Sequence, residues 1–152
     1  MRTNNRIDRA FGPVGSTAGV FIFLAGIGII YFSLAGLIFI IVGAFVGFTS
    51  SLTVVDFDNK KIKYGDNFFG FIKTGKWIQI EDSMVLGLKQ KRGVWRAYSR
   101  SNRTLEIKEN NNYIILFDSN KVEIAPIFKS TNRSKAEQEL GNLSSLLGLK
   151  TI

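Results

Sequence analysis

The sequence predicts a membrane-anchored protein with an N-terminal two-helix transmembrane hairpin, followed by a mainly antiparallel β domain capped by one C-terminal α-helix. Two observations predict this class. No charged residue occurs between Arg9 and Asp56, a run of 46 residues, and short alternating runs of apolar and polar residues then follow as far as residue 128. We expect a cytoplasmic N-terminal segment (1–12), the hairpin (13–50) and a cytoplasmic β domain with its helix (51–152).

The uncharged block is too long for one spanning helix. As a single α-helix, residues 14–48 would extend roughly 52 Å, against a hydrocarbon core of about 30 Å. Two helices fit better, the first from about Pro13 to Ile30 and the second from about Leu34 to Thr49, with a turn at residues 31–33. The alternative, a cleaved signal peptide, has a much shorter apolar region.

Glycine placement supports the hairpin. If the chain folds back near residue 32, Gly15 and Gly19 come to the same depth in the bilayer as Gly43 and Gly47. Small residues at such positions allow close contact between helix backbones. The alternative is that glycine is simply common in transmembrane helices. Because the block holds no Asp, Glu, Lys, Arg or His, we do not expect a proton relay or transport site within it.

The charges flanking the block set the expected orientation. The formal net charge is +8, and both flanks are basic. By the positive-inside rule, both termini should lie in the cytoplasm, which agrees with an even number of spans.

After Ser51 we expect up to nine short strands, in regular spacing typical of an antiparallel sandwich or barrel. Gly93 and the polar run Asn110–Asn112 are expected to form turns between them. The expected strands are 52–57, 60–64, 68–72, 76–80, 84–90, 94–100, 104–109, 113–117 and 122–128.

The C-terminal segment has a helical pattern instead. Ser134 and Glu137 have the spacing of a capping box. Apolar residues then recur at intervals of three and four, which predicts one amphipathic helix, and Gly148 is a plausible stop.

Three short runs carry a resemblance to a known family: Ile62-Lys63-Tyr64, Phe69-Gly70-Phe71 and residues 75–80. With the order of elements, they make the chain similar to bacterial pleckstrin-homology-like (bPH) domain membrane proteins with an N-terminal transmembrane hairpin. The resemblance implies a PH-like sandwich or barrel over residues 51–150. It also implies a multi-pass protein of the bacterial inner membrane, acting as a non-enzymatic scaffold that binds lipid headgroups, peptides or partner subunits. Phosphoinositide specificity is not expected, because the basic motif of eukaryotic relatives is missing.

The most unusual stretch of the soluble part, residues 83–105, is basic and contains no Asp or Glu. We expect it to form a basic hairpin that contacts anionic lipid, at about 1 kcal/mol per well-placed cation, or a protein partner. A solvated basic face is the alternative, and single-stranded nucleic acid is disfavoured because the anchor would confine it to the membrane. The candidate residues are Lys89, Lys91, Arg92, Arg96, Arg100 and Arg103.

Aromatic side chains are the second group of candidates. Three phenylalanines within four residues are too apolar for both faces of a free strand, so we expect one face to pack on the hairpin, on lipid or on a partner chain. The two tryptophans are further interface candidates, although one of them is also a candidate for the core. These residues are Phe68, Phe69, Phe71, Trp77 and Trp95.

Composition excludes several kinds of chemistry. The chain has no His and no Cys, which removes imidazole bases, thiol nucleophiles and the usual zinc ligands. The acid pairs lie at strand ends or turns, where solvated carboxylates are common. We therefore expect no catalytic residue, metal, cofactor, small-molecule substrate or nucleic acid. The expected function is a scaffold or accessory subunit of an inner-membrane complex; the alternative is a module that binds anionic headgroups. Expected partners are the bilayer and either protein subunits or further copies of the chain.

Overall fold

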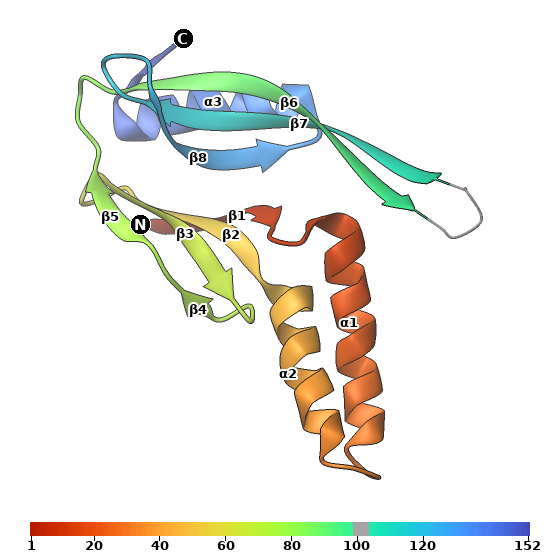
Figure 1. The fold of residues 1–152 in the computed structure, drawn as a ribbon. Coiled ribbons are helices and arrows are strands. Elements are labelled where there is room, and N and C mark those ends of the chain that lie inside the picture. The colour runs from red at the N-terminus through yellow and green to blue at the C-terminus, as the bar shows by residue number, and fades with distance from the viewer. Residues whose placement is uncertain (99–103) are drawn as a thin grey trace.

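The computed structural model describes residues 1–98 and 104–152, and for residues 95, 97, 98, 104 and 105 it describes the backbone alone. Two apolar helices extend from one side of a domain built from two β-sheets, and a third helix packs on this domain (Figure 1). The predicted mainly antiparallel β domain with a C-terminal helix is confirmed.

The two apolar helices are α1 (Gly12–Ile29) and α2 (Ala35–Phe48). Each predicted bound is confirmed to within one residue. Pro13 stands in the first turn of α1, where its missing N–H removes no intrahelical hydrogen bond. A tight turn follows α1, in which the backbone N–H groups of Phe32 and Ser33 both donate to the carbonyl of Ile29 at 2.9 Å.

Glycines bring the backbones of α1 and α2 into contact. A Cβ placed on Gly19 would lie 2.4 Å from the backbone nitrogen of Gly47, and one on Gly43 would lie 2.3 Å from that of Phe23. The predicted close approach is therefore confirmed for Gly19, Gly43 and Gly47. No side chain larger than hydrogen fits at these positions without movement of the helices.

Two features of this contact differ from the prediction. Gly26 and Gly36, which the sequence analysis did not single out, make a second close approach nearer the turn. Gly15 does not share the contact, because the nearest atom to a Cβ placed there would be Cβ of Phe11, at 2.9 Å. The reason is length: α2 ends one residue after Gly47, so it has no further turn to set against Gly15.

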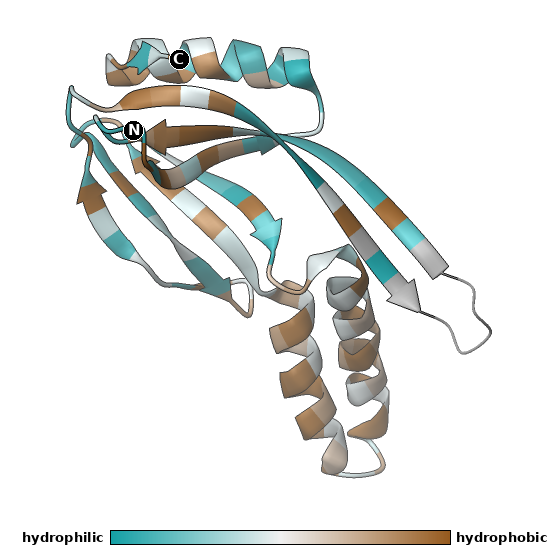
Figure 2. Cartoon of the chain, turned by 45° about the horizontal axis from the view of Figure 1, so that its top comes forward, coloured by the Kyte–Doolittle hydropathy of each residue, from teal (hydrophilic) through white to brown (hydrophobic). Residues whose placement is uncertain are grey.

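The outward faces of α1 and α2 are apolar and uncovered. Phe21 is 69% exposed and Phe32, in the turn, is 93% exposed. Both helices are hydrophobic around their circumference (Figure 2). By length and composition alone, α1 qualifies as a helix that could cross a membrane, whereas α2, with 14 residues, is a shorter apolar helix. That the pair crosses a bilayer stays a prediction.

The first sheet contains a strand that the sequence analysis did not foresee. Residues 1–12 are predicted to be an N-terminal segment outside the β domain, but β1 pairs antiparallel with β2 and so belongs to the first sheet. In the same sheet β2 pairs with β3, and β4 and β5 both pair with β3. Only Ile7 among the residues of β1 is a large apolar residue, so the strand pattern is weak. The bounds are β1 (Arg2–Arg9), β2 (Ser50–Asp56), β3 (Lys61–Phe68), β4 (Ile72–Lys73) and β5 (Lys76–Gln79).

Pairing of β1 with β2 brings together the chain segments before α1 and after α2. Arg9 pairs with Ser50, and the N–H of Ala10 donates to the carbonyl of Thr49 at 3.2 Å. The two helices are therefore an insertion between two neighbouring, paired strands. Residues directly before α1 and directly after α2 lie together.

The far end of β1 is held by an ion pair. Arg2 Nε donates to Oδ2 of Asp56 at 2.7 Å, and the Asn59 side-chain amide donates to the same oxygen at 3.1 Å. The Asp56 residue is only 3% exposed. The hydrogen bond from Asn59 and then that from Arg2 lower the pKa of Asp56 to about 2.

The second sheet is built around two long strands, where four short ones were predicted. Gly93 pairs with Glu109 and Arg92 with Asn110, so the expected turns at Gly93 and at Asn110–Asn112 lie inside strands. β8 pairs with β7 only as far as Asn112. The distal parts of β6 and β7, residues 91–98 and 104–111, extend beyond it as a two-stranded ribbon (Figure 1). The bounds are β6 (Val85–Tyr98), β7 (Thr104–Phe117), β8 (Glu123–Ser130) and β9 (Lys150–Thr151).

Helix α3 (Arg133–Leu147) closes the domain as predicted, and Gly148 ends it in the left-handed conformation, with φ of 69°. The cap is a correction: Asn132, not Ser134, accepts the N–H of Lys135 at 3.3 Å. The main core joins α3 to both sheets. It includes Leu143 and Leu147 of α3, Leu86, Ile114 and Leu116 of the second sheet, and Val55 and Ile62 of the first.

We predict that Gly19→Ala lowers the free energy of unfolding in detergent by about 1–3 kcal/mol, because the new methyl group overpacks the contact with Gly47. Gly28→Ala is the matched control on the same helix, since a Cβ there meets nothing within 4 Å. It should be neutral or stabilising by up to about 1 kcal/mol. Thermal or denaturant unfolding of both variants makes the measurement, and equal effects would contradict the contact.

A second prediction concerns acid stability. Because folding lowers the pKa of Asp56 from 3.8 to about 2, its contribution is fully present above pH 3.8 and is lost as the pH falls toward 2. Asp56→Asn should therefore be less stable than the wild type above pH 3.8, and the difference should shrink toward pH 2. Melting temperatures across this range measure it, with Asp82→Asn, an exposed acid away from β1, as the control. A difference that does not change with pH would contradict the role of Asp56.

Candidate membrane-facing surface

The predicted aromatic cluster packs on α2. The ring of Phe68 stacks on that of Phe45, with centroids 6.1 Å apart and 9° between planes, and Phe69 meets Phe45 edge-on at 5.5 Å. Phe71 is 73% exposed. Of the three predicted surroundings for this cluster, the helical pair is thus the one observed for Phe68 and Phe69.

These phenylalanines do not form the predicted third strand at 68–72. Phe69 and Gly70 have positive φ angles, 53° and 82°, and the N–H of Phe71 donates to the carbonyl of Phe68 at 3.1 Å. The segment is therefore a turn between β3 and β4, next to the C-terminal end of α2.

The two tryptophans are only partly accounted for. Trp77 is not a core residue, because it is 44% exposed, and the guanidinium of Arg2 lies 5.8 Å from its ring centroid. The side chain of Trp95 lies outside the described residues.

Several of the predicted basic residues of β6 form ion pairs with acidic residues of β7 and β8. Arg96 pairs with Glu106, directly opposite on β7, with 3.0 Å between Arg96 Nε and Glu106 Oε1. Glu123 of β8 pairs with Lys89, and with Lys91 at 3.7 Å. The hydrogen bond from Arg96 and the charge of Lys108 lower the pKa of Glu106, and the hydrogen bond from Lys89 lowers that of Glu123.

Three of the six predicted basic residues therefore form ion pairs with acids outside the basic stretch: Lys89 and Lys91 share Glu123, and Arg96 shares Glu106 with Lys108. The two carboxylates offset only part of this positive charge. Arg92 is exposed and forms no ion pair with any residue that the structure describes. Arg100 and Arg103 lie outside the described residues. The local sequence could not reveal this neutralisation, because the acids are placed by strand register and by β8.

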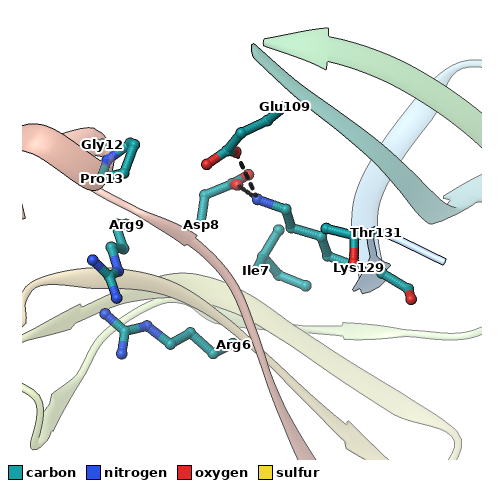
Figure 3. Close-up of a pocket in the computed structure, with 10 residues that line it drawn as sticks. Arg6, Ile7, Asp8, Arg9, Gly12, Pro13, Glu109, Lys129 and Thr131 are labelled. Atoms are coloured by element: carbon teal, nitrogen blue, oxygen red, sulfur yellow. Dashed lines mark hydrogen bonds and ion pairs between the residues drawn. The ribbon is translucent and has the colours of Figure 1, made fainter. Parts of the chain in front are cut away.

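A hollow of about 620 Å³ opens where β1 leads into α1 (Figure 3). It lies between the start of α1 and the strands β7 and β8. Arg6 and Arg9 stand beside each other on one side of β1, away from the acids of the hollow. Burial and then the charge of Arg9 lower the pKa of Arg6. The lining residues are Arg6, Ile7, Asp8, Arg9, Gly12, Pro13, Glu109, Lys129, Ser130 and Thr131.

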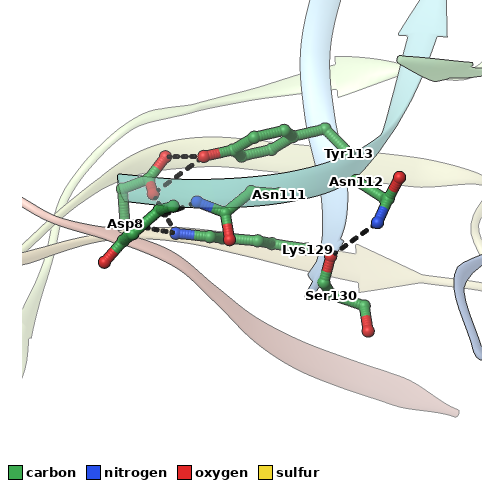
Figure 4. A network of polar contacts seen from close by, with 7 residues as sticks. Asp8, Asn111, Asn112, Tyr113, Lys129 and Ser130 are labelled. Atoms are coloured by element: carbon green, nitrogen blue, oxygen red, sulfur yellow. Dashed lines mark hydrogen bonds and ion pairs between the residues drawn. The ribbon is translucent and has the colours of Figure 1, made fainter. Parts of the chain in front are cut away.

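A polar network on the other side of this hollow joins β1 to β7 and β8 (Figure 4). Asp8 accepts hydrogen bonds from Tyr113 Oη at 3.0 and 3.1 Å and from Lys129 Nζ at 2.7 Å. Lys129 also lies 3.7 Å from Glu109, whose carboxylate accepts from the Asn111 amide at 2.9 Å. Both acids of the hollow are thus already paired.

The pKa shifts in this network follow from its geometry. Burial, and then the negative charge of Asp8, raise the pKa of Tyr113. For Lys129, burial acts to lower the pKa, but the hydrogen bond and charge of Asp8 raise it more, so the net shift is upward. Lys129 therefore stays protonated and Tyr113 stays neutral, which keeps the network intact at neutral pH.

The residues around the hollow were missed at the sequence level. Arg6, Asp8 and Arg9 lie in the polar N-terminal segment, for which the sequence analysis predicts no strand. The available signal was the placement of two arginines, three residues apart, directly before the apolar block. Within the described part of the chain, no group of three or more His, Cys, Asp or Glu side chains is placed to hold a metal ion.

A comparison with protein-family models, curated proteins and solved structures found no match to this chain. The resemblance to bPH-domain membrane proteins therefore stays a prediction.

We predict that Asp8→Asn lowers the free energy of unfolding by about 1–3 kcal/mol, because it weakens the hydrogen bonds of Tyr113 and of the charged Lys129. Asp82→Asn removes an exposed ion pair with Lys60 and should change the stability by less than about 1 kcal/mol. Denaturant unfolding of the two variants gives the comparison. If Asp8→Asn changes the free energy of unfolding no more than Asp82→Asn does, the network does not stabilise the packing of β1 on the second sheet.

Proposed function

We propose that this chain is a non-enzymatic membrane protein in which α1 and α2 cross the bilayer as a hairpin and hold the β domain against its cytoplasmic surface. There the β domain acts as a scaffold or accessory subunit for other membrane proteins. The observation that carries the proposal is the uncovered apolar surface of the helical pair. A helix that is apolar all round is stable only when it is buried in a protein core or in a membrane.

Helix lengths are compatible with this arrangement. α1 extends about 27 Å and α2 about 21 Å, against a hydrocarbon core of about 30 Å. The exposed apolar turn between them, which includes Tyr31, Phe32 and Leu34, adds to this length. Local thinning of the bilayer accommodates the remaining difference at modest cost.

The pairing of β1 with β2 supports one location for both ends of the hairpin. Arg9 and Ser50 are ladder partners, so the chain leaves the helical pair on the side where it entered. The basic flanks favour the cytoplasm for that side. The exposed ring of Phe71 and the packing of Phe68 on Phe45 would place the β3–β4 turn at the interface.

Single cysteines test this topology, because the chain has none of its own. We predict that Ser33→Cys, in the turn between α1 and α2, reacts with a membrane-impermeant maleimide added outside intact bacterial cells. Asn4→Cys in β1 and Ser145→Cys in α3 should react only in inverted membrane vesicles. Labelling of Asn4→Cys and Ser145→Cys from opposite sides would contradict the hairpin, as would release of the protein by alkaline carbonate without detergent.

The same membranes test the scaffold role. After solubilisation in a mild detergent, the chain should elute in a complex with other subunits or with further copies of itself. Elution as a single chain under every detergent condition would contradict that role while leaving the topology intact.

A further inference from the structure

Arg6 and Arg9 carry unneutralised positive charge at the entrance to α1. Both side chains are exposed, and neither forms an ion pair with any residue in the described part of the chain. The acids that share their hollow are engaged elsewhere: Asp8 binds Tyr113 and Lys129, and Glu109 binds Asn111 and Lys129. Two neighbouring cations repel each other, and an anion bound to both of them offsets that repulsion.

Their position along the chain limits what that anion can be. Arg9 precedes Gly12, the first residue of α1, by three residues, and β1 is fixed beside the end of α2 by its pairing with β2. If α1 enters the hydrocarbon core at its first turn, both guanidinium groups lie within the headgroup layer, which is about 5–8 Å thick in each leaflet. This step depends on the proposed function.

We propose that Arg6 and Arg9 bind the phosphate of an anionic phospholipid headgroup in the part of the hollow next to β1 and the start of α1. A guanidinium group presents parallel N–H donors that match two phosphate oxygens, so two neighbouring arginines can bind one phosphate together. The volume of about 620 Å³ is sufficient for a headgroup. Lys129 lines the same hollow but is held by Asp8, so the arginines supply the affinity.

This site differs from the basic stretch that the sequence pointed to. Arg96 of the ribbon and Lys89 before it on β6 have acidic partners, so an anion would have to displace a carboxylate there. Arg6 and Arg9 have no such competitor among the described residues. We therefore place the lipid contact at the N-terminal strand, where two arginines without acidic partners lie together, whereas Arg92 is the single such residue among the described candidates of the ribbon.

The test uses the full chain in detergent and native mass spectrometry with added phosphatidylglycerol or phosphatidylcholine. We expect phosphatidylglycerol to bind more tightly, and Arg6→Gln/Arg9→Gln to weaken it roughly 25-fold, at about fivefold for each cation. Lys121→Gln/Lys150→Gln removes the same charge from exposed positions away from α1 and should change the affinity less than twofold. Arg6→Lys/Arg9→Lys should retain part of the affinity, and its melting temperature shows that the fold tolerates substitution at both positions.

Equal weakening by the two glutamine variants would overturn the site, because only net charge would then matter. Equal binding of the two lipids by the wild type would overturn it as well. If inorganic phosphate, added at the same concentration as the lipid, displaced phosphatidylglycerol, the site would be one for a soluble anion, and the proposal would be wrong. The proposed membrane topology is tested separately by the cysteine labelling, which involves no lipid measurement. A wrong topology can therefore be distinguished from a wrong lipid site.

Discussion

The close backbone contact between α1 and α2 determines where the rest of the chain lies. Because Gly19 and Gly47 allow the helices to touch, residues 10 and 49 come within hydrogen-bonding distance, and β1 can pair with β2. That pairing makes an N-terminal segment with little apolar content part of the first sheet. It also places Arg6 and Asp8 where neither could be placed by local sequence alone.

Charge on this protein is organised by pairing across strands. Lys91 and Arg96 of the ribbon contact acids from β8 and β7, and Asp8 on β1 contacts Lys129 on β8. Such exposed or half-exposed pairs contribute little stability each. Their larger effect is to decide which cations stay free to attract an anion, and among the described residues Arg6 and Arg9 are the ones that share a hollow.

Aromatic side chains connect the helices to the β domain. Phe45 of α2 meets Phe11 before α1 as well as Phe68 and Phe69 in the β3–β4 turn. Edge-on and stacked contacts of this kind bury large apolar areas without leaving polar groups unpaired. They orient the β domain relative to the helical pair, and so set which of its faces lies nearest to the helices.

The sequence by itself determined the elements whose signal is local. An uncharged block with a polar residue at its centre predicted α1 and α2 almost to the residue, and the spacing from Ala136 to Leu147 predicted α3. Only the tertiary structure decided the pairing of β1, the passage of two strands through Gly93 and Asn110–Asn112, and the neutralisation of Arg96. Helices form hydrogen bonds within one segment, so their pattern is visible along the chain. Strands take their partners from distant segments, so their extent and the charges they bring together emerge only when those segments meet.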